Sequence, residues 1–232
     1  MGGALPRSDL RVTVERESPA LVRVARTADD WAAIRSLCCR TGNGGDPIDR
    51  DRWPLFGELW IGPYQRLVPD WTYVAEVDGR VVGYLTGCPD TAALRRARRF
   101  RVTLRLLAGI ACRRYAWTAD ARRMVALAFR LRRGTEARLA PQLPADLART
   151  HPAHLHMNVE AESRRHGIGA ALIQRYARDL GAIGVPGIHL VCGPGPRAFY
   201  ERNGFTEMAT IEVAPGRWVH TLGRRLVAPA GS

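Results

Sequence analysis

The residue pattern best suited to chemistry is a glycine-containing turn between an apolar segment and an amphipathic one. Arg164, Gly167 and Gly169 form an Arg-x-x-Gly-x-Gly motif that follows the alternating segment 154–160 and opens the helical pattern 167–180. Glycine lets the main chain turn tightly and approach a ligand closely. The first N–H groups of a helix lack internal partners and lie at the positive end of its dipole. A strand, turn and helix in this order therefore predict a phosphate or pyrophosphate site.

Two common nucleotide motifs do not fit this turn. A dinucleotide fingerprint needs a third glycine where Leu172 stands, and an acidic residue after the next strand, which ends at Cys192 without one. A Walker A loop needs a lysine, and the chain contains none. The turn alone leaves open a third alternative, an ordinary strand-to-helix connection that binds no ligand.

A second sequence block narrows the possible ligands of the turn. The sequence Arg197-Ala-Phe-Tyr-Glu-Arg-Asn-Gly-Phe205 follows the turn after one further strand-like segment. The order and spacing of the two blocks resemble the GNAT superfamily of acetyl-CoA-dependent N-acetyltransferases. This resemblance implies an α/β (α+β) fold, the GNAT fold. Its central, twisted sheet is mixed but mostly antiparallel, with about six to seven strands, helices on both faces and a helical insert between the third and fourth strands.

Further segments resemble one branch of that superfamily. They are Thr41-Gly-Asn-Gly-Gly-Asp46, Trp60-Ile-Gly-Pro-Tyr64, Val82-Gly-Tyr-Leu-Thr-Gly87 and Pro152-Ala-His-Leu-His156. The branch comprises bacterial acetyltransferases related to the acetyltransferase-like domain of O-GlcNAcases. With these segments the resemblance covers about residues 21–222. Because domains of that branch can lack the cofactor motif, a binding module without turnover is an alternative function, although Arg164, Gly167 and Gly169 favour cofactor binding.

The resemblance implies acetyl-CoA (coenzyme A) as cofactor and assigns a set of binding residues. The turn would hold the pyrophosphate, main-chain groups of Met157 and Val159 would pair with the pantetheine arm, and the fourth and fifth strands would part to admit it. The cofactor-binding residues expected are Met157, Asn158, Val159, Arg164, Arg165, His166, Gly167, Ile168, Gly169 and Ala170. Many members have an asparagine and an alanine where this chain has Gly193 and Pro196, which puts one usual cofactor hydrogen bond in doubt.

Three residues are candidates for catalysis. Tyr200 lies in the second block, and a phenol with a pKa of about 10 can protonate a leaving thiolate; its structural alternative is a packing tyrosine. Glu160 and His156 rank first as general bases, since the acceptor amine must lose a proton, and Asp90 or a chain of water molecules is an alternative. A histidine on a strand is more often structural. The acceptor is expected to be a small-molecule or protein amine, and no metal site is expected.

The charge of the chain suggests a different partner. The net charge is +13, and all 35 basic residues are arginine. Fourteen arginines and two acidic residues lie between residues 93 and 138. Such a segment can bind nucleic acid or an anionic membrane surface through phosphate, but few aromatic residues interrupt it. We therefore favour a solvated basic surface over nucleic-acid binding, and recognition of an acidic acceptor is a further alternative.

Length and composition predict one domain. We expect a loose tail at 1–20, a single domain at 21–226 with an arginine-rich helical insert at about 91–148, and a tail at 227–232. No apolar stretch approaches the ~20 residues of a membrane span. The five cysteines show no Cys-x-x-Cys spacing, and we expect free thiols in a cytoplasmic protein that is a monomer or homodimer.

Local signals predict some elements closely. Thr27-Ala-Asp-Asp30 is a capping-box pattern before a helix whose apolar face carries Trp31 and Ile34. Asp78-Gly79 between two alternating segments predicts a tight hairpin. A second helical stretch is expected at about Trp53 to Arg66.

Overall fold

A computed structural model describes residues 20–42, 45–98 and 143–226, together with isolated positions 108, 112, 118, 119, 122, 123, 125 and 126. Most of the arginine-rich segment 93–138 and both predicted tails therefore lie outside the described residues. The predicted insert is described mainly at its two ends. Residues 91–98 are helical, and the short helix α6 (Leu147–Thr150) precedes the next strand.

Seven strands form one mixed sheet in the order β1-β2-β3-β4-β5-β7-β6. They are β1 (Leu21–Val24), β2 (Thr72–Val77), β3 (Arg80–Cys88), β4 (Ala153–Val159), β5 (Gly187–Cys192), β6 (Thr206–Ala214) and β7 (Arg217–Arg225). Neighbouring strands are antiparallel except for β4 and β5, which are parallel. This mixed, mostly antiparallel sheet with helices on both faces confirms the predicted fold class.

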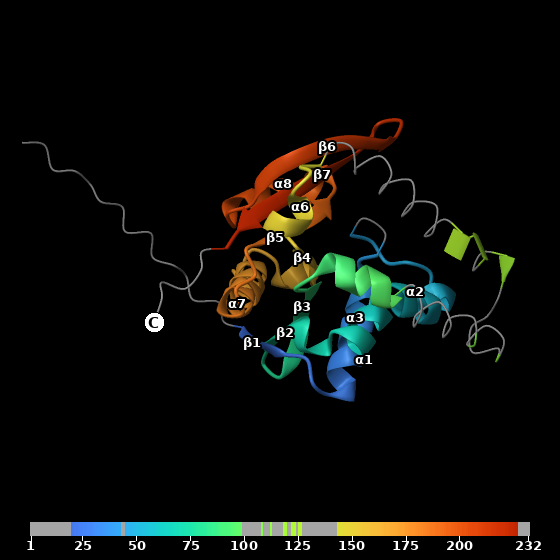
Figure 1. The fold of residues 1–232 in the computed structure, drawn as a ribbon. Coiled ribbons are helices and arrows are strands. Elements are labelled where there is room, and N and C mark those ends of the chain that lie inside the picture. Colours follow the sequence, from blue (N-terminus) through green and yellow to red (C-terminus); the bar gives the residue numbers. More distant parts are fainter. Residues whose placement is uncertain are drawn as a thin grey trace, which may run out of the picture.

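Helices cover both faces of the sheet (Figure 1). Figure 1 shows α7 on one side of the central strands and α1, α2 and α3 on the other, with α8 beside β5 and β7. The α-helices not yet given are α1 (Ala28–Arg40), α2 (Trp53–Trp60), α3 (Gly62–Leu67), α7 (Ile168–Ala182) and α8 (Pro194–Arg202). Short 3-10 turns are η1 (Arg50–Arg52), η2 (Pro69–Trp71) and η4 (Ala161–Ser163). Two helical layers therefore enclose the strands that approach the glycine turn.

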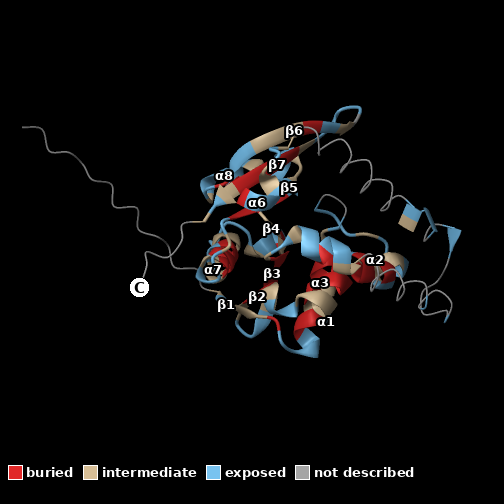
Figure 2. Ribbon diagram, viewed as in Figure 1, coloured by how far each residue is buried: buried red, intermediate tan, exposed pale blue. Residues whose placement is uncertain are grey.

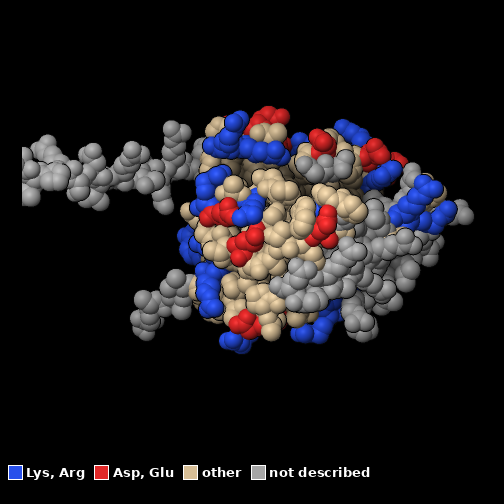
Figure 3. Space-filling view, turned by 90° about the horizontal axis from the view of Figure 1, so that it is seen from above, with Lys and Arg blue, Asp and Glu red and all other residues tan. Residues whose placement is uncertain are grey.

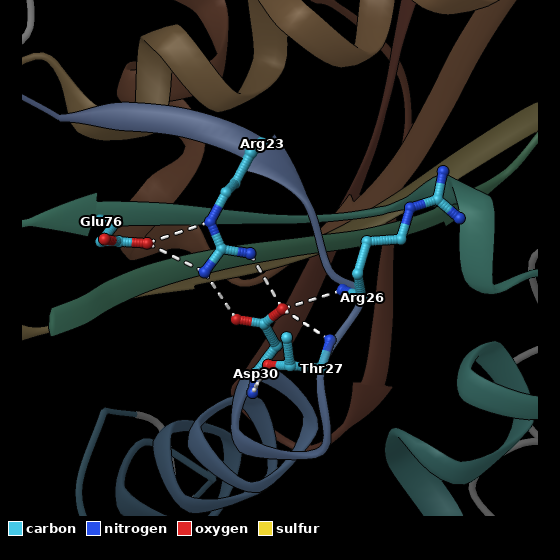
Figure 4. Close-up of polar contacts among 5 residues, drawn as sticks. All are labelled: Arg23, Arg26, Thr27, Asp30 and Glu76. Carbon is cyan, nitrogen blue, oxygen red and sulfur yellow. Dashed lines mark hydrogen bonds and ion pairs between the residues drawn. The ribbon is translucent and has the colours of Figure 1, made fainter. Parts of the chain in front are cut away.

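The start of α1 shows why the capping pattern folds as predicted. The Thr27 side chain accepts a hydrogen bond from the Asp30 N–H, and the Asp30 carboxylate accepts one from the Thr27 N–H, which completes the capping box. The Asp30 carboxylate also accepts two hydrogen bonds from Arg23, at 2.8 and 2.9 Å, and Arg23 donates a further one to Glu76 (Figure 4). One buried carboxylate thus joins α1 to β1, and through Arg23 to β2.

The hairpin between β2 and β3 also follows its predicted turn. Asp78 and Gly79 have φ values of +50° and +74°. Both lie in the left-handed region that a two-residue type I′ turn requires. The prediction of this hairpin is confirmed, and it places β3 between β2 and β4.

The stretch predicted to be helical at about Trp53 to Arg66 is helical, but it is divided. The chain forms two helices, α2 and α3, with Ile61 between them. Pro63 lies in the first turn of α3, where a missing N–H is tolerated. Inside a continuous helix the same proline would have removed a hydrogen bond and clashed with the preceding turn. The break lets α3 turn toward the sheet, where Tyr64 reaches β4.

Two apolar clusters hold the layers together, one on each face of the sheet (Figure 2). The larger lies between the sheet and helices α7 and α8, and includes Leu155, Ile168, Leu172 and Tyr176. The smaller packs α1 against β2 and β3. Burying a large apolar side chain contributes roughly 1.5–3 kcal/mol, so these clusters fix the positions of α7 and α1 relative to β4.

Strands β4 and β5 pair for only two residues. Ala153 pairs with Ile188 and His154 with His189, and no further pairing between them occurs in the described chain. On its other side β4 remains paired with β3 as far as Val159. The edge of β4 that faces β5 is therefore left without a strand partner over its second half.

The described surface carries charges of both signs. In the space-filling view of Figure 3 the arginines lie mostly at the margins, with carboxylates among them. Several arginines pair with acids, such as Arg26 with Asp70 and Arg175 with Asp179. Within the described residues, no helix has the length and apolar character needed to cross a membrane.

Candidate functional site

The two faces of β4 carry different chemistry. Side chains alternate along a strand, and Leu155, Met157 and Val159 belong to the apolar cluster that packs on α7. His154, His156 and Asn158 project from the opposite face. There, His154 contacts Tyr64 of α3, and Asn158 contacts Tyr84, which packs with α1. β4 therefore separates an apolar, α7-side environment from a polar one on the side of α1 and α3.

Main-chain groups of Met157 and Val159 face the unpaired edge of β4. Glu160 N–H donates to the Val82 carbonyl of β3, and in an antiparallel pair such bonded positions alternate along the strand. Asn158 and His156 then also point their main-chain groups to β3, while Met157 and Val159 point theirs away. The Val159 carbonyl accepts a hydrogen bond from Arg164 at 3.1 Å, which is consistent with its pointing away from β3. Extended main chain with free groups can pair with a ligand as a strand would.

The glycine turn (residues 164–170) has two residues in the left-handed region. Arg165 and Gly167 have φ values of +66° and +77°. Backbone turns with left-handed residues form N–H concavities that bind anions. Among the described residues, no backbone acceptor bonds to the N–H groups of Arg165–Ala170. These groups also lie at the N-terminus of α7, a helix of 15 residues, which is the geometry expected of an anion site.

The first three side chains of the turn, those of Arg164, Arg165 and His166, are exposed. Arg164 bends back so that its Nε donates to the Val159 carbonyl, which ties the turn to the end of β4. Arg165 and His166 extend from the surface of the turn. A left-handed non-glycine residue such as Arg165 is uncommon and is often found at functional sites.

Gly169 brings three elements together. A Cβ at this position would lie 2.9 Å from Cζ of Phe199 on α8 and 3.5 Å from Cε of Met157 on β4. The lack of a side chain thus lets the first turn of α7 contact both neighbours. Tyr200, the next residue on α8, stacks edge-on with Phe199 at a centroid distance of 5.2 Å.

Tyr200 is buried in the α7-side cluster. Its ring packs edge-on against Phe205 at a centroid distance of 5.7 Å. Burial, with a smaller contribution from neighbouring Cys192, raises the pKa of the Tyr200 phenol well above its usual value. The phenol therefore stays protonated over the physiological range and keeps a proton to donate.

Cys192 ends β5 near Tyr200. Burial is the main cause that raises the pKa of the Cys192 thiol to about 11. A thiol that stays protonated is a poor nucleophile. The geometry thus disfavours a route through an acetylated cysteine.

His156 lies on the polar face of β4. His156 is exposed at the surface. The protein packed around it nevertheless desolvates the imidazole, and this desolvation lowers the pKa of His156 to about 4. Asn158 lies beside it, with 3.3 Å between the amide nitrogen and Nε2 of His156. At neutral pH the imidazole is therefore uncharged and can accept a proton.

Glu160 follows β4 and is buried, with 6% of its side chain exposed. Arg80 donates a hydrogen bond to its Oε2 at 2.7 Å. Arg40 lies 2.8 Å from Oε1 as an ion pair that lacks hydrogen-bond geometry. Both carboxylate oxygens are therefore occupied by guanidinium groups.

The structure thus brings part of the predicted set together. Met157, Val159, Ile168 and Tyr200 share one cluster, and the glycine turn adjoins it. His156 and Glu160 lie on the other face of β4. Sequence reasoning missed the partners of the residues on this polar face, namely Arg40 and Arg80 for Glu160, and Tyr84 for His156 and Asn158. Each comes from an element distant in the sequence, and no local spacing indicates such contacts.

Known proteins share both the motif and the fold. A family model described as Acetyltransferase (GNAT) domain matches residues 136–207. The crystal structure of SsHAT is 31% identical, with 90% of this chain and 98% of that chain covered and a TM-score of 0.70. The chain belongs to the GNAT superfamily. It is accordingly a GNAT-type N-acetyltransferase.

More distant GNAT structures share the fold. A phosphinothricin acetyltransferase from Sinorhizobium meliloti, in complex with AcCoA, is 16% identical over 92% of each chain, with a TM-score of 0.51. Ard1 from Thermoplasma volcanium is 14% identical over 90% of this chain and 99% of its own, with a TM-score of 0.52. The narrower resemblance of this GNAT chain to relatives of O-GlcNAcases stays a prediction.

Two matched glycine substitutions, one beside each end of α7, test whether the glycine turn binds an anion. Gly167→Ala should weaken acetyl-CoA binding about tenfold, because a Cβ at φ +77° both strains the turn and redirects its N–H groups. Gly184→Ala is the control: Gly184 has φ +74° and open space around a Cβ. Both substitutions should cost about 1–2 kcal/mol of stability. Calorimetric titration with acetyl-CoA should separate them, and equal affinities in the two variants would contradict the site.

Proposed function

We propose that this acetyltransferase moves an acetyl group from acetyl-CoA to an amine by direct attack of the amine on the thioester. The observation that carries the proposal is the parting of β4 and β5 beside an N–H-lined turn. The free edge of β4 and the turn are joined by the Arg164 bond to Val159, so one extended ligand can contact both. Acetyl-CoA has the shape and charge for this, with an amide-containing arm and a pyrophosphate.

The residues that would hold acetyl-CoA divide by chemical group. N–H groups of Arg165–Ala170 would bind the pyrophosphate, and Arg164 and Arg165 would add charge-assisted contacts. Main-chain groups of Met157 and Val159 would pair with the pantetheine amides, with Asn158 between them. When bound, acetyl-CoA supplies an activated acyl carbon and a good leaving group.

The two faces of β4 suggest how the proton transfers are divided. Tyr200 lies on the α7 side, where its phenol would donate a proton to the sulfur as the carbon–sulfur bond breaks. His156 lies on the opposite side, where the amine would arrive. Its neutral imidazole would accept the proton that the amine nitrogen loses as the carbon–nitrogen bond forms. Proton donor and acceptor would thus act on opposite sides of one carbonyl.

Glu160 is the less suited of the two proposed bases. To accept a proton it would have to weaken an ion pair with Arg40 or Arg80 while remaining buried. Within the described part of the chain, His156 has no ion pair to weaken, so its protonation is opposed only by the desolvation that lowers its pKa. We therefore propose His156, directly or through a water molecule, as the route for the proton.

A screen of amines with acetyl-CoA tests the proposed function. Release of free thiol should depend on enzyme, acetyl-CoA and amine together, and the acetylated amine should be found by mass spectrometry in equal amount. Thiol release without an acetylated product would mean hydrolysis. No release with any small amine or lysine-containing peptide would contradict turnover.

We further propose a cytoplasmic location and a monomeric or homodimeric state. All five cysteines are free, which suits a reducing compartment. Cell fractionation that recovers the protein outside the cytoplasm would contradict this location. Light scattering that gives a mass above that of a dimer would contradict the proposed assembly.

A further inference from the structure

Glu160 is a buried carboxylate at the end of β4 that pairs with two partly exposed arginines. We call Glu160, Arg40 and Arg80 the Glu160 cluster. Arg40 is the last residue of α1, and Arg80 is the first residue of β3, so the carboxylate joins three segments that are far apart in sequence. A buried carboxylate is unfavourable unless its charge is compensated. Here two guanidinium groups compensate it.

The main chain of Glu160 is fixed as well. Its N–H donates to the Val82 carbonyl at 2.9 Å, and its carbonyl accepts from the Ser163 N–H at 3.1 Å. Four residues later Arg164 begins the glycine turn and bonds back to Val159, the residue before Glu160. The segment from Val159 to Arg164 is therefore closed by a hydrogen bond between its two ends. Glu160 lies within this segment and anchors it to α1 and β3.

We propose that Glu160 is a positioning residue that sets the glycine turn for acetyl-CoA, and that it acts through Arg40 and Arg80 rather than by taking a proton from the amine. This inference rests on the proposed function. The ion pairs fix the end of β4, and the end of β4 fixes the direction of the N–H groups in Arg165–Ala170. Loss of the carboxylate charge frees both arginines and lets the turn vary.

The Glu160 cluster also links the two substrate sides. Arg40 ends α1, which packs on the polar side of β4, whereas the glycine turn lies at the start of α7. A change at Glu160 should therefore alter acetyl-CoA affinity without altering the group that titrates in the chemical step. A general base would behave in the opposite way.

The test compares Glu160→Gln and Arg80→Gln with the wild-type chain. Both variants should bind acetyl-CoA about tenfold more weakly by calorimetry, while the pH dependence of kcat keeps its shape. Arg80→Gln guards against misfolding of the first variant, because the Arg80 side chain is 65% exposed. Arg26→Gln is the matched control: it removes an arginine ion pair of 2.6 Å with Asp70, away from the turn, and should leave the affinity unchanged.

Amide hydrogen exchange gives a second readout that needs no activity. Exchange at Arg165–Ala170 should be faster in Glu160→Gln and Arg80→Gln than in wild type and Arg26→Gln. Unchanged affinity and exchange, with loss of kcat and of its pH dependence in Glu160→Gln alone, would overturn the positioning role and make Glu160 the base. If the wild type itself fails to bind acetyl-CoA, the proposed function fails, and exchange at the turn still decides the role of the Glu160 cluster.

Discussion

Tyr200→Phe should lower kcat about 10²-fold or more while changing the KM for acetyl-CoA only a few-fold. Phenylalanine keeps the ring that packs against Phe199 and Phe205, so the fold and the cofactor site should persist. In the proposed mechanism, what the substitution removes is the proton for the departing sulfur. Steady-state kinetics with saturating amine would measure the effect.

The pH dependence of the rate and a substitution at the neighbouring Cys192 test the role of the Tyr200 phenol further. Burial raises the pKa of Tyr200, so the wild-type rate should show no loss from tyrosine ionisation up to about pH 10. Cys192→Ala lies beside Tyr200 and should keep nearly the wild-type rate, since the Cys192 thiol, with a pKa of about 11, stays protonated. Equal rates for Tyr200→Phe and wild type would remove the phenol from the mechanism, and an inactive Cys192→Ala would favour an acetyl-cysteine route.

Asp30→Ala should cost about 2–4 kcal/mol of unfolding free energy. The Asp30 side chain is 3% exposed and accepts hydrogen bonds from Arg23 and from the N–H groups of Arg26 and Thr27. Its removal deletes the cap of α1 and leaves Arg23 with Glu76 alone. We place the cost below that of a fully buried pair because Arg23 is itself 35% exposed. Urea unfolding would measure it.

The same group predicts a pH dependence of stability. The pKa of Asp30 lies well below its usual value of about 3.9, and the largest cause is the hydrogen bonding from Arg23. A lowered pKa means that the stabilisation is complete above the unfolded-state pKa and is lost as the pH falls through the folded-state pKa. Asp30→Asn should flatten that acid loss. Asp70→Asn, which breaks an exposed pair with Arg26, should cost no more than about 1 kcal/mol; equal costs at the two positions would contradict the account.

Local signals in the sequence predicted much of the fold. Three such signals are the Thr27–Asp30 capping box, the Asp78-Gly79 turn and the glycine turn. Each depends on hydrogen bonds or φ angles among residues that are close in sequence, and the structure has the predicted element at all three. The division of α2 from α3 was missed because helical periodicity continues through Ile61 and Pro63. At that point the direction of the chain is set by packing against the sheet.

The candidate site was less accessible from sequence. Motif spacing pointed to Met157, the glycine turn and Tyr200, which the structure places around one cluster. The environments of His156 and Glu160 depend on long-range contacts. The ring of Tyr84 packs near His156, and Arg40 and Arg80 pair with Glu160. Which of two polar residues on a strand can accept a proton is decided by such contacts, and no pattern along the chain encodes them.

A backbone-amide NMR titration with acetyl-CoA tests the central claim most directly. We predict that the largest shift changes fall on Arg165–Ala170 and on Met157 and Val159, with Gly167→Ala reducing them at equal ligand concentration. Small changes are predicted for β6 and β1, which lie at the two edges of the sheet. Saturable binding whose largest changes lie away from the glycine turn and the end of β4, or no binding at millimolar acetyl-CoA, would contradict the account.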